Sequence, residues 1–164
     1  MENNIKILGY KAVIDNINET LYEVNNLFDS KESVVQLLDA DGVAGKDHVL
    51  HAVYQAISAF DSDESIASDL GVEVLVRLSA QRQISKAFDM LGLKNGEMNI
   101  CIVLINCPEQ TETQLNTLFT RDDTVLEAED EKLINLYGIT DKELQVLSIK
   151  HILIEKTTML FVNH

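Results

Sequence analysis

The chain has little proline, little glycine and no long apolar run. One Pro and seven Gly in 164 residues exclude a collagen-like chain and a Pro/Gly-rich disordered one. The longest apolar run, residues 100–105, is far too short to span a bilayer. A chain of this length is the size of one domain, in which about two thirds of the unfolded surface can be buried. We therefore expect residues 1–164 to form a single globular domain.

Basic residues are also scarce. The chain has 13 Lys and Arg against 27 Asp and Glu, which gives a formal net charge of -14. Most of such a surface repels polyanions, so any contact with nucleic acid must be made by a local basic patch. The first residues, 1–4, lack the basic and then apolar pattern of a secretion signal. We expect a cytoplasmic protein that makes no membrane contact.

Cysteine and histidine give no recognisable metal or redox motif. The spacing of Cys101 and Cys107 matches neither, and Cys101 is expected to be a small buried hydrophobe because it lies in the apolar run. His48 and His51, with Asp47, could share one face of a helix, but a third ligand at a predictable spacing is missing. We expect no metal, no cofactor and no catalytic residue.

Four segments have the pattern of β-strands, and helical periodicity separates them. The predicted strands are residues 5–8, 34–38, 72–78 and 98–105. The last is apolar on both faces, which is typical of a central strand. Apolar residues at helical spacing are Ile17, Leu21, Val24 and Phe28, then Leu50, Val53, Ile57 and Phe60, then Ile84, Ala87, Phe88 and Leu91. Asp15 and Ser79 are the predicted N-caps of the first and third helices, and Gly92 is the predicted left-handed end of the third.

The C-terminal segment is unusually apolar. Thr140 and Glu143 form a capping-box pattern, so a long helix is predicted over residues 141–162. This helix carries more apolar residues than one buried stripe requires, which favours docking of a partner on it. Two alternatives stay open: residues 149–154 form a buried strand, or the helix is enclosed within its own domain. The preceding acidic segment, residues 121–132, is predicted to be a solvated loop, which short helices could flank.

Two stretches carry the residues that are most suited to binding. The loop of residues 42–47 leads from a strand into a helix and resembles a phosphate-binding loop, but its glycine spacing and Asp47 exclude a Walker A motif. Its glycines and Lys46 suit a single phosphate, although a plain turn is the alternative. Residues 77–86 concentrate three cations and two amides in an acidic chain, and Arg82 and Lys86 either meet an anion or pair with surface carboxylates.

These stretches resemble a known family. Residues 35–48, 51–56 and 77–87, with the apolar strand and the helical C-terminus in order, are similar to archaeal members of the TPRKB (PRPK-binding protein) family. That resemblance implies an α+β domain, which we expect to contain a mixed sheet of four to five strands packed with helices and a long C-terminal helix. It also implies a non-catalytic subunit of the KEOPS complex, which modifies tRNA with a threonylcarbamoyl group on the adenosine beside the anticodon.

The resemblance further implies two partners. The first is a PRPK-type kinase or ATPase, which itself contacts the threonylcarbamoyl-transferase subunit. The residues expected to dock this kinase are Ile149, Ile152, Leu153, Lys156, Leu160 and Phe161. The second is the single-stranded CCA end of tRNA, which is bound by phosphate contacts and base packing. The expected tRNA-binding residues are Gly45, Lys46, His48, Arg77, Arg82, Gln83 and Lys86.

Two other functions remain alternatives from the sequence. One is a small nucleotide-binding enzyme that uses the loop of residues 42–46. The other is a homodimer whose apolar C-terminal helix packs against its own copy.

Overall fold

The computed structural model describes residues 3–27 and 33–162, without the side chains of residues 161 and 162. The described strands are β1 (Ile5–Ile14), β2 (Val34–Asp39), β3 (Gly96–Ile105) and β4 (Thr120–Arg121). The α-helices are α1 (Ile17–Asn25), α2 (Lys46–Asp61), α3 (Leu70–Ser79), α4 (Ile84–Leu91), α5 (Gln110–Leu118), α6 (Asp130–Tyr137), α7 (Asp141–Val146) and α8 (Ile149–Val162). Two 3-10 helices are η1 (Ala40–Gly42) and η2 (Asp123–Leu126). The α+β class is confirmed.

One antiparallel sheet forms the centre of the molecule, with strand order β2-β3-β1-β4. β3 pairs with β1 along ten residues and with β2 along six, which confirms that the apolar strand is central. β4 pairs only with Tyr10 and Lys11 of β1. All three pairings are antiparallel, so the expectation of a mixed sheet is wrong in this detail.

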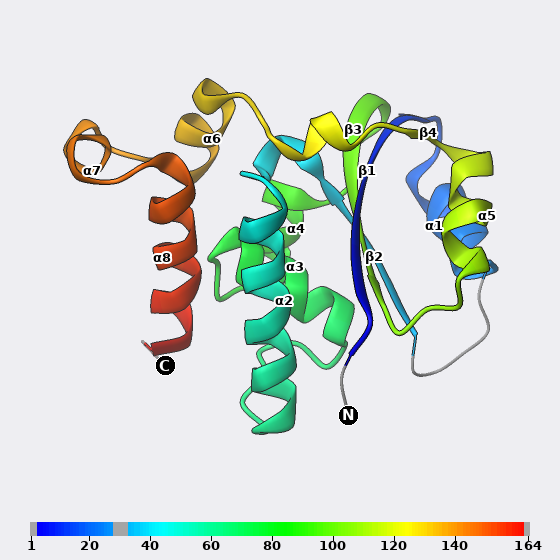
Figure 1. The fold of residues 1–164 in the computed structure, drawn as a ribbon, viewed down its shortest axis with the longest axis horizontal. Helices are drawn as coiled ribbons and strands as arrows, with labels where there is room; N and C mark the ends of the chain where they lie inside the picture. The colour runs from blue at the N-terminus through cyan, green and yellow to red at the C-terminus, as the bar shows by residue number, and fades with distance from the viewer. Residues whose placement is uncertain (1–2, 28–32, 163–164) are drawn as a thin grey trace.

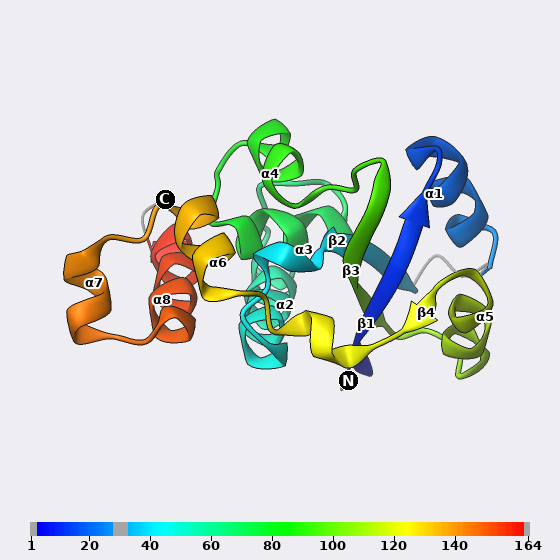
Figure 2. The same ribbon diagram turned by 90° about the horizontal axis from the view of Figure 1, so that it is seen from above.

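Helices cover the two faces of the sheet unequally (Figure 1). On one face, α2, α3 and α4 pack against Ile7, Leu38 and Val103 in the larger core. On the other face, α1 and α5 lie over Leu8, Ile100 and neighbouring side chains in a second core. The view from above shows that α6, α7 and α8 form an arm at the end of the molecule opposite to α1 and α5 (Figure 2). A third, smaller cluster holds this arm to the loop that precedes α2.

The segment predicted as the third strand is the helix α3. The alternating valines suggested a strand with two faces. In the structure every residue from Glu73 to Ser79 is buried, so this helix has no exposed polar side from which a helical period could be recognised. The helix begins where the Asp69 side chain accepts the N–H of Val72. It ends at Ala80, which is left-handed with a φ of 58°.

Several helix ends differ from their predicted residues. Asn16, and not Asp15, caps α1 by accepting the N–H of Glu19. Ser79 is the last residue of α3, and Gln83 precedes α4 without a side-chain cap. Gly92 has an extended backbone, with φ -73° and ψ 168°. Of the predicted apolar positions of the first helix, Phe28 lies outside the described residues.

The long C-terminal helix is confirmed only in part, because it is divided into α7 and α8. Leu147 is extended between them, and the Ser148 hydroxyl accepts the N–H of His151 to start α8. The predicted capping box is present, since Thr140 and Glu143 exchange side-chain to backbone hydrogen bonds. The alternative of a strand over residues 149–154 is therefore wrong.

The acidic segment is ordered by its own charges. Arg121 forms ion pairs with Glu112 and Asp123, and the Asp122 side chain accepts the N–H of Thr124 at the start of η2. Hydrogen bonding from Arg121 is the main cause that lowers the pKa of Asp123 to about 2. The segment contains the end of β4, the short helix η2 and the start of α6. Its acidic residues are mostly exposed, as predicted, but Val125 and Leu126 are buried, so it is not a solvated loop throughout.

Candidate functional site

The helix α8 buries three of the six side chains that were expected to dock a kinase. Ile152, Leu153 and Leu160 are buried, because they pack against α2, α3 and α6 within the same chain. Each keeps 6% of its surface or less, so these residues do not form an exposed docking face as predicted, although Ile152 and Leu160 line a hollow beside α8. Among the alternatives, enclosure of the apolar side of the helix within its own domain is the one observed.

A different side of α8 faces outward. His151, Glu155 and Met159 are spaced four residues apart and are all exposed, so they form one stripe along the helix. Met159 keeps 51% of its surface accessible and is the apolar member of this stripe. This stripe, His151–Glu155–Met159, is named the outer stripe of α8 below.

Three expected docking residues have other positions. Ile149 and Lys156 are half-buried, and Lys156 lies 3.7 Å from a carboxylate oxygen of Glu143 on α7. Phe161 belongs to the last turn of α8, but its side chain lies outside the described residues. Of the six predicted docking residues, Ile149 and Lys156 therefore remain as described candidates.

A hollow of about 530 Å³ opens between α8 and the α3–α4 connection. Its lining residues come from five segments of the chain. They are Ser79, Ala80, Gln81, Arg82, Leu136, Tyr137, Glu143, Ile152, Glu155, Lys156, Met159 and Leu160. The hollow therefore combines a residue of the predicted tRNA patch, Arg82, with residues of the predicted kinase-docking helix. The sequence placed these two sites apart, and the fold makes them adjacent.

Arg77 is not part of any surface. Its side chain is 0% exposed, and its Nε donates to Glu73 at 2.7 Å one helical turn away. The other carboxylate oxygen of Glu73 accepts the N–H groups of Ile66 and Ala67. The pair thus ties α3 to the connection that follows α2, and the predicted contact between Arg77 and tRNA is wrong because the guanidinium is in the core.

Arg82, Gln83 and Lys86 are exposed, as the sequence predicted. Within residues 3–27 and 33–162, neither Arg82 nor Lys86 forms an ion pair. The alternative that these two cations pair with surface carboxylates is therefore not observed. They are therefore open to an external group.

The loop before α2 is occupied by contacts within the chain. The N–H of Gly45 donates to Leu126 at 2.7 Å, and Lys46 lies 3.7 Å from Asp123. A small hollow at this helix start is lined by Lys46 and Lys150 but also by three carboxylates, those of Asp47, Asp123 and Glu127. These acids offset the positive end of the helix dipole, so the loop is poorly suited to a phosphate.

His48 serves the interior of this loop. It is fully buried, its Nδ1 accepts the N–H of Ala44 at 3.0 Å, and its ring makes an edge-on contact with Tyr137. Burial is the main cause that lowers the pKa of His48 to about 3, with smaller contributions from His51 and Lys150. His48 is therefore a neutral core residue, and its predicted place beside tRNA is wrong. Gly45 is likewise buried.

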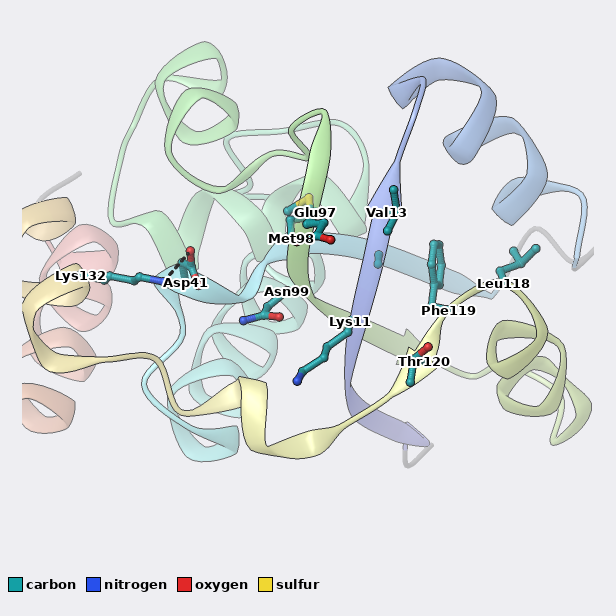
Figure 3. A pocket seen from close by; sticks show the side chains of 11 residues that line it. Lys11, Val13, Asp41, Glu97, Met98, Asn99, Leu118, Phe119, Thr120 and Lys132 are labelled. Carbon is teal, nitrogen blue, oxygen red and sulfur yellow. Dashed lines mark hydrogen bonds and ion pairs between the residues drawn. The ribbon is translucent and has the colours of Figure 1, made fainter.

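Another hollow lies beside β1, β3 and β4 (Figure 3). It measures about 650 Å³ and is lined by Lys11 and Val13 of β1, Asn99 of β3 and Phe119 near β4. Lys132 of α6 pairs with Asp41 at its border, as the dashed line in Figure 3 marks. Its cations and carboxylates balance, and its polar sheet residues are typical of a solvated face.

Two other kinds of feature are absent from the described residues. Within residues 3–27 and 33–162, no cluster of three or more His, Cys, Asp and Glu is placed to hold a metal. In the same part of the chain, no helix has both the length and the apolarity to cross a membrane. Cys101 is fully buried, as predicted.

The comparisons with known proteins agree with the family resemblance. The model of the family described as kinase binding protein CGI-121 matches residues 11–159. The chain belongs to this family. Regulatory protein Cgi121 of Methanocaldococcus jannaschii is 40% identical over 99 residues, which are 59% of this chain and 63% of that relative. The match thus spans less than two thirds of the relative, and the predicted TPRKB-type membership is confirmed.

Sequence reasoning missed the outer stripe and the hollow beside it. The i, i+4 spacing of His151, Glu155 and Met159 was visible, but eleven apolar residues in the segment obscured which side of the helix would face outward. Glu73 and Arg77 at i, i+4 were a second missed signal, since this pair is typical of a helix and not of a strand.

Proposed function

We propose that this chain is a non-catalytic regulatory subunit that binds a PRPK-type kinase. The observation that carries this proposal is membership of a family of kinase binding proteins over residues 11–159. The relative from M. jannaschii is named a regulatory protein, which also favours a binding role over catalysis. By the same resemblance, the assembly in which it acts is a KEOPS-type complex that modifies tRNA.

The outer stripe of α8 is the proposed contact with the kinase. It offers an exposed apolar residue, Met159, next to a charged one, Glu155, and it borders a hollow large enough to receive side chains of a partner. A separate apolar candidate is Tyr54 of α2, which lines a hollow with His51, and His51 is hydrogen-bonded to Thr158 of α8 at 2.9 Å. Tyr54 is itself exposed. Large aromatic and thioether side chains of this kind are enriched in protein interfaces.

Calorimetry with a purified PRPK-type kinase tests this function. Met159→Glu should weaken binding at least tenfold, because it places an unpaired charge at the centre of the contact. The matched control is Val13→Glu, which makes the same kind of change at an exposed residue on the opposite end of the molecule. Failure of the wild-type protein to bind the kinase would reject the proposal, and equal binding by both variants would reject the surface.

A second proposed role is binding of the tRNA CCA end near the start of α4. The observation in its favour is that Arg82 and Lys86 are exposed without an ion pair in the described part of an acidic chain. Gln83 and Lys46 complete the accessible members of the predicted set, although Lys46 is paired with Asp123. Lys86→Ala should weaken binding of intact tRNA more than of tRNA that lacks its CCA end, with a strong dependence on salt. Equal binding of both RNAs would argue against recognition of that end.

The nucleotide-binding alternative has less support. The N–H of Gly45 is used within the chain, and three carboxylates surround the helix start where a phosphate would bind. A thermal-shift experiment with nucleotides and magnesium is expected to give no stabilisation.

A further inference from the structure

We propose that Arg82 and Glu155 select the kinase by holding one of its segments in the hollow beside α8. In that kinase segment, an apolar side chain is flanked by an acidic and a basic residue. This inference rests on the proposed function and specifies the chemistry of its contact. It also assigns Arg82 to the kinase, so that Lys86, Gln83 and Lys46 are left for the tRNA role proposed above.

Arg82 lies beside the outer stripe of α8. It lines the same hollow as Glu155, Lys156 and Met159 of α8. Lys86, the other exposed cation of the segment, is not among the residues that line this hollow. The two cations that the sequence grouped together therefore face different surroundings, and only Arg82 is beside the outer stripe.

Two of the charged residues that line the hollow form no ion pair in the described part of the chain. Four charged residues line it, and Lys156 and Glu143 already pair with each other at 3.7 Å. Arg82 and Glu155 form no ion pair within the described residues, although they come from different walls. A segment that fills the hollow complements both most strongly if it carries a carboxylate toward Arg82 and a cation toward Glu155.

Apolar side chains form the rest of the lining that bears on the partner. Leu136, Ile152, Met159 and Leu160 contribute carbon surface between the charged residues. An apolar side chain of the partner is therefore expected between its two charges, as in interfaces where a desolvated anchor is surrounded by polar contacts. A polyanion fits this hollow less well, because the carboxylates of Glu143 and Glu155 balance the cations of Arg82 and Lys156 and leave no net positive charge.

Charge reversal at matched positions tests the proposal. Arg82→Glu is compared with Lys86→Glu, which gives the same change of net charge at an exposed residue four positions away. Glu155→Arg is compared with Asp89→Arg, an exposed position on α4 that does not line the hollow. We expect each hollow variant to weaken kinase binding at least tenfold and each control variant less than threefold, with unchanged melting temperatures.

The outcomes separate the inference from the function on which it rests. If the wild-type protein does not bind the kinase, the proposed function fails. If it binds but Arg82→Glu and Lys86→Glu have equal effects, only long-range electrostatics acts and the inference is overturned. It is also overturned if Arg82→Glu leaves kinase binding unchanged and weakens tRNA binding. Restoration of binding to Arg82→Glu by a kinase variant that replaces one acidic surface residue with Lys would identify the facing carboxylate.

Discussion

Two connections in this chain lead into a helix and carry basic residues, yet their chemistry differs. The connection of residues 42–46 enters α2. The N–H groups of residues 43, 44 and 45 are hydrogen-bonded within the chain, that of Ala44 to His48 of α2, and Lys46 pairs with Asp123. The connection of residues 80–83 enters α4 without a side-chain cap, and its Arg82 and the following Lys86 are unpaired in the described part of the chain. In the sequence, the first resembled a phosphate-binding loop more closely.

The difference shows that polar residues identify a binding segment only when their partners are known. In the first connection, the acidic segment of residues 121–132 returns to fill the site, since Asp123 meets Lys46 and Leu126 meets Gly45. In the described part of the chain, no acidic segment pairs with the basic residues of the second connection in this way. The four predictions below test whether the first connection is structural and the second is free, in order of decreasing expected effect.

Removal of Arg77 should have the largest effect, since it lies just before the second connection but belongs to the core. Arg77→Ala leaves the buried Glu73 carboxylate without its partner, which costs about 3–5 kcal/mol of unfolding free energy. Urea unfolding measures this loss. The double variant Glu73→Gln with Arg77→Met removes both charges and should recover much of it. A loss below about 1 kcal/mol for the single variant would contradict the buried pair.

Acid should destabilise the first connection through His48. Unfolded His48 binds a proton below its ordinary pKa of about 6.5, whereas the folded residue stays neutral down to about 3. The unfolded state thus binds more protons in this window, and stability falls as pH decreases, by about 1.4 kcal/mol per pH unit.

The control for this pH dependence is His48→Asn, whose Oδ1 can still accept the N–H of Ala44 but cannot titrate. Between pH 5 and 6.5, the slope of the unfolding free energy against pH should be smaller in this variant, by about the amount that one bound proton contributes. An identical slope in both proteins would show that His48 does not carry the effect.

Loss of the Tyr137 hydroxyl should have a smaller effect. This hydroxyl donates to the carbonyl of Gly42 at 2.6 Å and so joins α6 to the first connection. Tyr137→Phe leaves that carbonyl without its donor, which costs about 1–2 kcal/mol by chemical denaturation. Tyr54→Phe, at an exposed tyrosine on α2, is the matched control and should be neutral. Equal stability of the two variants would contradict the link.

Replacement of the free cations should have the smallest effect on stability. Arg82→Ala with Lys86→Ala removes two exposed side chains without an ion pair in the described residues, so the unfolding free energy should change by less than about 0.5 kcal/mol. Calorimetric melting of the variant checks this. A clear destabilisation would mean that the second connection is structural, like the first.

Local patterns predicted much of the secondary structure. The strands over residues 34–38 and 98–105 and the helices that became α2 and α4 were found because their periodicity is local. The capping box at Thr140 was found for the same reason. The helix α3 was missed because burial on every side removes the polar face from which a period is recognised. For the site, exposure of Arg82, Gln83 and Lys86 was predicted, but the burial of Arg77 and His48 was not.

The sequence by itself determined a single α+β domain, its family and the segments in which binding residues lie. Which of those residues are accessible was decided only by the tertiary structure. Burial depends on contacts between segments far apart in the chain, such as α8 with α2 and the residue pair Asp123 and Lys46. Periodicity reports only on neighbours along the chain, so it could not show that α8 turns its Leu153 inward and its Met159 outward, beside Arg82.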